Sequence, residues 1–177
     1  MDNIDKAYDF YSKHIYDKEK IELLTEYNLK TAGFVPPVLW ELFGALITGK
    51  KGTGLTGADL DGWEVKSSAE RGSFEYQYHL NTGRPKLVED CQVKHLFCSY
   101  SKNYKDVTVR MMAGEELREH FFDKWLPQYE KNYDMSVDST ARRQRFRKSI
   151  PFGHIFRNGK LILEIKNTNI VYKNTVY

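Results

Sequence analysis

Acidic and basic residues gather around one tight turn before the middle of the chain. Asp59, Glu64 and Lys66 lie in the segment GADLDGWEVKSS, which has Asp61-Gly62 at its centre. Asp-Gly favours a two-residue hairpin turn, so we expect Asp59 to face Glu64 across two short strands. Because side chains alternate along a strand, Glu64 and Lys66 share a face. That face would carry two carboxylates and one ammonium group.

Two carboxylates that face each other across a hairpin repel, and a bound divalent cation removes this conflict. Ligands that are all oxygen favour a hard ion such as Mg²⁺, with water completing the coordination shell. We expect the metal ligands to be Asp59, Glu64 and the main-chain carbonyl of Val65. Lys66 would orient or activate a water molecule and stabilise charge on a phosphate. The expected catalytic residues are therefore Asp59, Glu64 and Lys66.

A charged hairpin face that is simply solvated is the alternative, because Glu-x-Lys is a common tripeptide. A second copy of it, Glu164-Ile165-Lys166, lies in the segment LILEIK. The neighbouring segment HIFR has no acidic residue that could face Glu164 across a hairpin. This difference favours the Asp59 segment as the metal site.

The composition indicates a single globular domain. The chain has 177 residues, of which 41% are hydrophobic and 29% charged, enough apolar material for a core. No apolar run is long enough to span a bilayer, and the acidic N-terminal segment does not resemble a secretory signal. Cys91 and Cys98 form neither a disulfide framework nor a metal motif. We therefore expect a cytoplasmic protein without membrane contact.

The elements that must position these residues alternate between helices and strands. Helices are expected over residues 4–28, 36–49 and 114–133, with Pro127 ending or bending the last one. Strands are expected over 93–100 and 107–112, a second hairpin about Asn158-Gly159, and irregular structure over 68–84. This order indicates an α/β fold, a mixed sheet flanked by helices in the α+β manner.

Asp followed by Glu-x-Lys across a hairpin resembles the PD-(D/E)XK nuclease superfamily. Further blocks resemble the PvuII-like type II restriction endonucleases, in the same order: ITG at 47–49, EVKSS at 64–68, FEYQYHLN at 74–81, QVKHLF at 92–97, FFDKW at 121–125 and IPFGHIFRNGK at 150–160. The resemblance spans about residues 24–162. It implies a restriction-endonuclease-like PD-(D/E)XK core whose acidic pair and lysine correspond to Asp59, Glu64 and Lys66.

The resemblance also implies an activity. It is the Mg²⁺-dependent, sequence-specific hydrolysis of double-stranded DNA by a homodimer, which leaves 5′-phosphate and 3′-hydroxyl ends. Mn²⁺ should substitute for Mg²⁺, and Ca²⁺ should support binding without cleavage. Residues 1–177 would form one nuclease domain, with the catalytic and DNA-binding elements over 36–177. The helical region over 1–35 is the candidate dimerisation region, and the alternative is that it packs only on its own core. A separate DNA methyltransferase acting on the same site is a conceivable partner that the sequence does not establish.

The DNA-binding residues are expected in two segments. The resemblance places Gln77, Tyr78, His79 and Asn81 in the first segment. The second is the basic run STARRQRFRKS at 139–149, which contains Arg142, Arg143, Arg145 and Arg147. A solvated basic loop is the alternative for this run. Arginine usually recognises guanine, and the family has asparagines there, so the recognition sequence does not carry over.

Two other functions stay open. A structure-specific or repair nuclease could use the same core, and cleavage of plain duplex DNA at one fixed sequence would separate it from a restriction enzyme. A catalytically silent DNA-binding module would have no need for an acidic pair next to DNA phosphates. Metal-dependent cleavage of a plasmid would exclude such a module.

Overall fold

The structure is a computed structural model that describes residues 2–54, 57–138, 140–141 and 145–176. Its elements follow in the order α1 (Asn3–Phe10), η1 (Tyr11–Ile15), α2 (Lys18–Glu26), α3 (Pro37–Thr48), β1 (Trp63–Ala69), β2 (Phe74–His79), α4 (Gly83–Asp90), β3 (Lys94–Tyr100), β4 (Val107–Ala113), α5 (Gly114–Leu117), η2 (Arg118–Phe122), α6 (Asp123–Asn132), β5 (Arg145–Ile150), α7 (Phe152–Asn158), β6 (Lys160–Lys166) and β7 (Asn169–Lys173). The label η marks a short π-helical segment. Among the described residues, no helix has the length and apolar character that crossing a membrane requires.

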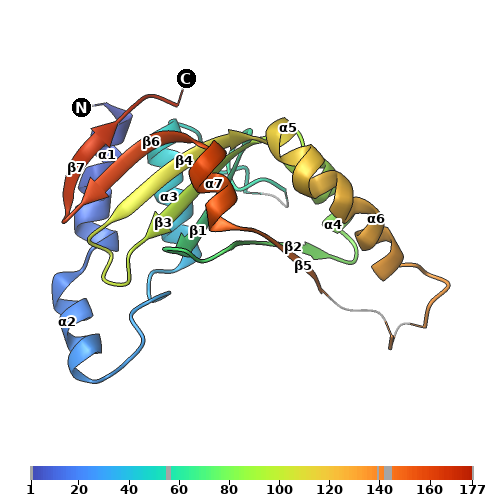
Figure 1. Cartoon of the computed structure of the whole chain (residues 1–177), viewed down its shortest axis with the longest axis horizontal. Helices are drawn as coiled ribbons and strands as arrows, with labels where there is room; N and C mark the ends of the chain where they lie inside the picture. Colours follow the sequence, from blue (N-terminus) through green and yellow to red (C-terminus); the bar gives the residue numbers. More distant parts are fainter. Residues whose placement is uncertain (1, 55–56, 139, 142–144, 177) are drawn as a thin grey trace.

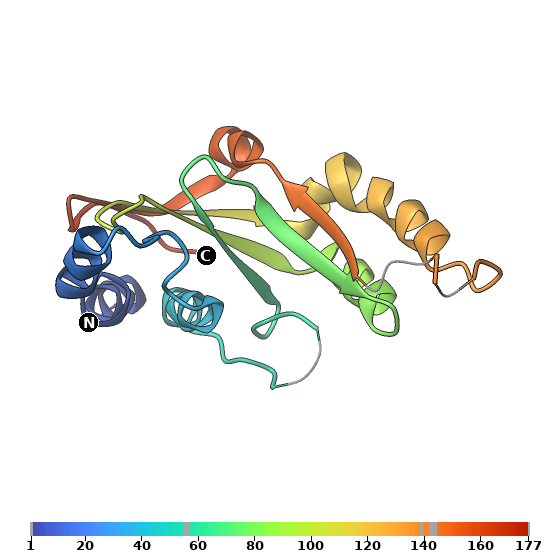
Figure 2. The same cartoon turned by 90° about the horizontal axis from the view of Figure 1, so that it is seen from below.

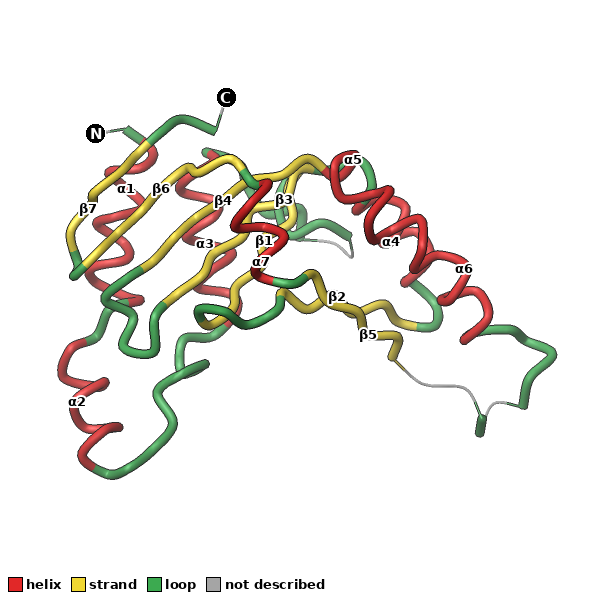
Figure 3. Tube along the Cα trace, viewed as in Figure 1, coloured by secondary structure: helices red, strands yellow, loops and turns green. Residues whose placement is uncertain are grey.

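The strands form two sheets (Figures 1 and 3). The main sheet has the strand order β1-β3-β4-β6-β7, in which β1 and β3 are parallel and the other neighbours are antiparallel. Strands β2 and β5 form a separate antiparallel ribbon. The ribbon lies with α4 and α6 to one side of the main sheet, and we call these four elements the arm. The fold is therefore mixed α/β, which confirms the predicted mixed sheet with flanking helices.

Two hydrophobic cores support these sheets. The first lies where α1 and α3 cover one face of the main sheet, opposite α7 (Figure 2), and it includes Trp40, Phe43, Val65, Leu96 and Val109. The second lies inside the arm and includes Tyr76, Tyr78, Leu87, Trp125 and Phe146. Strand β3 contributes to both cores, because Leu96 and Cys98 belong to the first and Phe97 to the second. The alternation of side chains along a strand explains this division.

Helix α3 fixes the depth of β1 in the first core. A Cβ atom at Gly44 would lie 2.7 Å from a methyl carbon of Val65, so glycine permits the close approach of helix and strand. The helix ends as the sequence predicts, with Gly49 in the left-handed conformation at φ 69°. Strand β1, which carries Glu64 and Lys66, is thereby held against a helix with little room to shift.

The long helices differ from their predictions. The helix expected over 4–28 breaks at Tyr16, whose backbone is extended, and Asp17 then begins α2 by accepting a hydrogen bond from the Lys20 amide at 2.9 Å. An Asp side chain favours such an N-cap. Helix α6 continues past Pro127 to Asn132, so of the two predicted effects of Pro127, ending or bending the helix, the structure rules out the first.

Two further predictions about local structure are wrong. Residues 68–84 are not irregular, because they contain the end of β1, all of β2 and the start of α4. Asn158-Gly159 does not turn a hairpin. It ends α7, and the Asn158 side chain donates to the His154 carbonyl at 2.9 Å. The two-residue turn lies instead at Asn167-Thr168, with φ values of 47° and 66°, between β6 and β7.

Candidate active site

The turn at Asp61-Gly62 forms as the sequence predicts. Leu60 and Trp63 form an antiparallel bridge with two backbone hydrogen bonds, of 2.9 and 3.0 Å, and Gly62 has the positive φ of 74° that the turn requires. Beyond this bridge the described residues form no strand pair between Asp59 and Glu64, so the prediction that they face each other across two short strands is wrong. Instead, β1 pairs along its length with β3. The turn therefore places Asp59 next to the first residues of β1, which is an edge strand.

Asp59 and Glu64 meet at this point. The Asp59 amide lies 3.3 Å from Glu64 Oε2, and Asp59 Oδ2 accepts a hydrogen bond from the Val65 amide at 2.9 Å. Asp61 is exposed in the turn and forms an ion pair with Lys50 at 3.6 Å. The geometry therefore brings Asp59, and not Asp61, to the side chain of Glu64.

Two lysines neutralise Glu64, which is 2% exposed. Lys66 Nζ lies 2.6 Å from Glu64 Oε1, and Lys86 Nζ lies 2.7 Å from Glu64 Oε2. Lys86 also forms an ion pair with Asp90, one turn further along α4, and Asp90 accepts a hydrogen bond from the Tyr78 hydroxyl at 2.8 Å. The sequence analysis assigned no role to Lys86 or Asp90. The i, i+4 spacing of Lys86 and Asp90 is the signal in the sequence. It brings two side chains together only on a helix, and no helix was predicted for this segment.

Burial and neighbouring charges shift the pKa values of these groups. Burial, together with the charge of Glu64, raises the pKa of Asp59 to about 6. Burial also raises the pKa of Asp90 to about 6, against the effects of Lys86 and Tyr78. Burial opposes the charge on Glu64, but Lys66 and Lys86 outweigh it and hold the pKa of Glu64 below its ordinary value. Asp59 and Asp90 thus share a raised pKa, and Glu64 is the carboxyl of the three whose charge is favoured.

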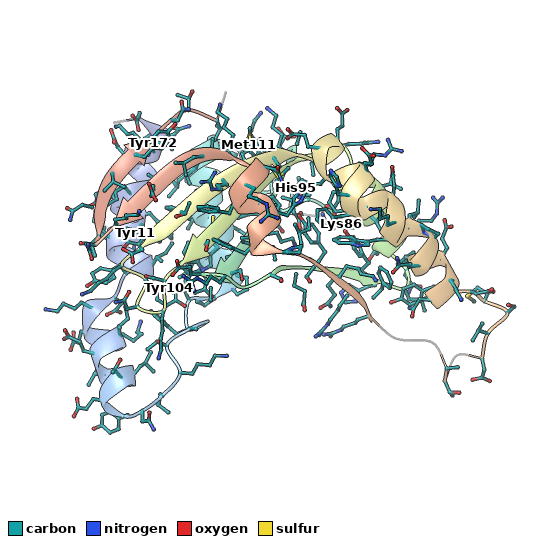
Figure 4. The ribbon with its side chains drawn as sticks, in the orientation of Figure 1. Tyr11, Lys86, His95, Tyr104, Met111 and Tyr172 are labelled. Carbon is teal, nitrogen blue, oxygen red and sulfur yellow. The ribbon has the colours of Figure 1, made fainter. Side chains whose placement is uncertain are left out.

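His95 lies beside Glu64 on the neighbouring strand and connects the site to the arm. Its Nε2 lies 2.8 Å from the Asp90 carbonyl, and its Nδ1 lies 2.9 Å from the Tyr76 hydroxyl. A carbonyl can only accept, so Nε2 carries the proton and Nδ1 accepts from the tyrosine. Burial lowers the pKa of His95 to about 4, so the imidazole is neutral. Figure 4 shows His95 and Lys86 where the main sheet meets the arm.

The residues present fit a hard divalent cation. Asp59, Glu64 and the Val65 carbonyl offer oxygen ligands only, and a cation would offset the burial and the charge of Glu64 that together raise the pKa of Asp59. The described residues contain no group of three or more His, Cys, Asp or Glu side chains arranged for a metal. Water would therefore fill much of the coordination shell, as Mg²⁺ prefers. Lysines contact both Glu64 oxygens, so a cation that binds there competes with an ammonium group.

A hollow of about 570 Å³ opens beside this cluster. Its walls include Gln77, His79 and Asn81, three of the predicted DNA-binding residues, together with Lys86 and Glu89. The hollow therefore adjoins the charged cluster, with Lys86 between its lining and the buried carboxylates.

The ribbon presents the other predicted DNA-binding residues. Gln77 is paired with Arg147 and His79 with Arg145 across β2 and β5. Arg145 is exposed, and the side chain of Arg147 is 54% exposed. Arg142 and Arg143 lie outside the described residues.

Only residues 70–73 connect β1 to β2, in a tight turn where the Gly72 amide donates to the Ala69 carbonyl at 2.8 Å.

Tyr78 does not belong with these surface residues. It is 1% exposed, because alternate residues of β2 point inward, and its hydroxyl donates to Asp90. The prediction that Tyr78 contacts DNA is therefore corrected: this side chain supports the buried carboxylate. The alternating aromatic residues in FEYQYH were the signal for this role.

A comparison of the sequence with models of known protein families gives no match, and a search among curated proteins gives none either. The geometry of the site and the sequence pattern are therefore the basis for a functional proposal.

The raised pKa of Asp59 predicts a pH-dependent stability in the metal-free protein. The folded protein binds the proton of the Asp59 carboxyl more tightly than the unfolded chain does, because the ordinary pKa of this carboxyl is 3.8. The stabilisation is therefore complete below about pH 4 and is lost as the pH rises through about 6. Asp59→Asn removes this loss. In EDTA, its free energy of unfolding relative to wild type should rise by about 2–3 kcal/mol between about pH 4 and pH 7.

Urea unfolding at several pH values measures this difference. Asp61→Asn is the matched control, because Asp61 is exposed in the same turn, and its difference from wild type should stay nearly constant with pH. If the difference in free energy of unfolding between Asp59→Asn and wild type does not change with pH, the surroundings of Asp59 do not destabilise its charged form.

Proposed function

We propose that the protein is a type II restriction endonuclease with a PD-(D/E)XK-like core. It would hydrolyse double-stranded DNA at a specific sequence in a Mg²⁺-dependent reaction that leaves 5′-phosphate and 3′-hydroxyl ends. The observation that carries the proposal is the contact between Asp59 and Glu64 at the start of β1, with Lys66 Nζ 2.6 Å from the same glutamate. The mixed sheet with flanking helices is compatible with such a core.

The residues around Glu64 have distinct parts in this reaction. Asp59, Glu64 and the Val65 carbonyl would hold Mg²⁺, which would supply positive charge for the phosphate and for the leaving oxygen. Lys66 orients the attacking water and adds positive charge beside the phosphate. The water oxygen bonds to phosphorus, the bond from phosphorus to the 3′ oxygen breaks, and a proton passes to that oxygen. The oxygen of the water stays on the 5′-phosphate.

The ribbon supplies recognition in this proposal. A two-stranded ribbon fits the major groove of B-DNA, where each base pair presents a distinct pattern of donors and acceptors. Gln77, His79, Arg145 and Arg147 are paired across the ribbon, and Asn81 lines the adjacent hollow. Arginine at this position suits guanine, whereas glutamine and asparagine suit adenine.

A homodimer follows from the symmetry of the substrate. One active site cuts one strand, so cutting both strands at a symmetric sequence calls for two copies related by a two-fold axis. The region 1–35 carries exposed apolar side chains that suit this contact: Leu23 is 48%, Tyr27 70% and Leu29 59% exposed. Exposed apolar groups of this kind mark interaction surfaces when they lie together.

The central test of the proposal compares two aspartates. Asp59→Asn should abolish Mg²⁺-dependent plasmid cleavage and leave DNA binding in Ca²⁺ intact or tighter, because it removes a negative charge near the phosphate. Asp61→Asn should retain substantial cleavage, because Asp61 lies in the turn and pairs with the exposed Lys50. The assays are plasmid digestion and a gel-shift measurement. An active Asp59→Asn protein, or an inactive but folded Asp61→Asn protein, contradicts the assignment.

A second prediction concerns base recognition by Arg147. Arg147→Ala should weaken binding to the cleavage site by about 1–3 kcal/mol and relax the preference at one base pair. Plasmid digestion maps the site, and binding to single-base variants of it measures the preference. Arg118→Ala is the control, because Arg118 is an exposed arginine of η2, outside the ribbon. It forms an ion pair with Asp123 of α6. Equal weakening on all duplexes would make Arg147 a phosphate contact only.

A third prediction concerns assembly. Sedimentation should show a dimer without DNA, and Tyr27→Asp together with Leu29→Asp should shift it toward the 20.8 kDa monomer. The control is Val171→Asp together with Tyr172→Asp, which places the same charge at two side chains that are 55% and 39% exposed on β7. A wild-type protein that is monomeric with and without its DNA site would exclude the dimer.

A further inference from the structure

Lys86 occupies the position at Glu64 that a cation would need. Its Nζ atom lies 2.7 Å from Glu64 Oε2 and contacts Asp90 as well, and its side chain is 18% exposed. Lys86 also lines the hollow of about 570 Å³ beside the ribbon. The same ammonium group thus touches a candidate metal ligand on one side and the expected DNA-binding space on the other.

The two lysines at Glu64 differ in how they are held. Lys66 extends from β1 itself, and its Nζ lies over the Tyr76 ring at 4.7 Å, with only Glu64 as its ion-pair partner among the described residues. Lys86 comes from α4 and has a second carboxylate, Asp90, one helical turn away. Asp90 is itself held by the Tyr78 hydroxyl. Lys86 can therefore release Glu64 and stay anchored at Asp90.

An ammonium group has three N–H donors. In the structure, two anions share those of Lys86, and the hollow lined by Gln77 and His79 adjoins the same side chain. A phosphate in that hollow would offer the acceptor that Lys86 loses when it leaves Glu64. The divalent cation would take the place of the ammonium group at the glutamate, and the phosphate would accept from the ammonium group that is released.

We propose that Lys86 is an exchangeable counter-ion that couples binding of a divalent cation to binding of DNA phosphate. Without metal, Lys86 neutralises Glu64. When a divalent cation binds, Lys86 releases Glu64 Oε2, keeps Asp90 and donates to a phosphate in the hollow. This role rests on the proposed function, and it predicts that metal and DNA favour each other through Lys86, with equal coupling in both directions.

The test measures Ca²⁺ binding by titration calorimetry, first without DNA. Lys86→Met removes the competing ammonium group, so it should bind Ca²⁺ at least about fivefold more tightly than wild type. Lys86→Arg should restore weak binding, because it keeps the charge. Lys50→Met removes a nearby lysine that pairs with Asp61, so it controls for the change in net charge and should leave the affinity within about twofold of wild type.

A second arm adds a short duplex that carries the mapped cleavage site. The duplex should tighten Ca²⁺ binding to wild type several-fold more than it does to Lys86→Met, since the variant has no counter-ion to transfer. A merely structural role for Lys86 would not change this coupling. Lys86→Met leaves Asp90 without its ion-pair partner. Both measurements are therefore repeated with the double variant Lys86→Met/Asp90→Asn, in which the buried charges are balanced.

The outcomes separate the inference from the proposed function. Tighter Ca²⁺ binding without DNA supports cation exchange even if the protein cleaves no DNA. Unchanged or weaker Ca²⁺ binding in Lys86→Met and in the double variant, beside an active wild type, overturns the exchange and leaves the nuclease in place. Equal tightening in Lys50→Met, or no Ca²⁺ binding by wild type and variants alike, also overturns it.

Discussion

The burial of the Glu64 carboxylate is the constraint on which the arrangement of the site depends. A carboxylate removed from water keeps its charge only where opposite charges or hydrogen bonds replace the solvent. Lys66 on the same strand and Lys86 on α4 provide them. Lys86 is itself largely buried and requires a second anion, which Asp90 supplies. One buried charge thus draws a helix of the arm against the edge of the main sheet.

The strand β3 makes this junction rigid. Its residues alternate between two cores, so neither core can move without moving the other. His95 lies on the side of β3 that faces the arm, and its neutral ring joins the Tyr76 hydroxyl to the Asp90 carbonyl. A charged histidine here would face the desolvation that lowers its pKa. Hydrogen bonds without net charge therefore complete the packing around the charged cluster.

The sequence predicts what short-range physics determines. The turn at Asp61-Gly62 follows from turn chemistry, and the end of α3 follows from the conformational freedom of Gly49. The contact of Asp59 with Glu64 was expected across a strand pair, but it forms through the Asp59 amide next to the turn. The partner strand of β1 was out of reach, because β3 lies some thirty residues away and its pairing depends on the whole sheet. The roles of Lys86 and Asp90 were out of reach for the same reason.

Other errors came from signals that fit two structures. Asn158-Gly159 suits a hairpin turn, but asparagine and glycine also favour a helix end, and the packing of Ile155 decides for the helix. In β2 the alternation of aromatic and polar residues already separated Tyr78 from Gln77 and His79. The resemblance to a DNA-binding segment obscured that distinction, because it assigned consecutive residues to one surface.

The connection over residues 70–73 has a consequence for any enzyme built this way. Strand β1 holds the charged cluster, β2 holds one side of the ribbon, and the four residues between them form a tight turn with Arg71 in the left-handed conformation at φ 64°. Further from the turn, the hydrogen bond between His95 of β3 and the Tyr76 hydroxyl of β2 connects the two parts again. The spacing between bases held by the ribbon and a phosphodiester bond at the cluster would then be a fixed length of the protein scaffold. The backbone would then set the distance between the recognised bases and the cleaved bond. The offset between the cuts in the two strands would follow from this distance and would not depend on which bases are recognised.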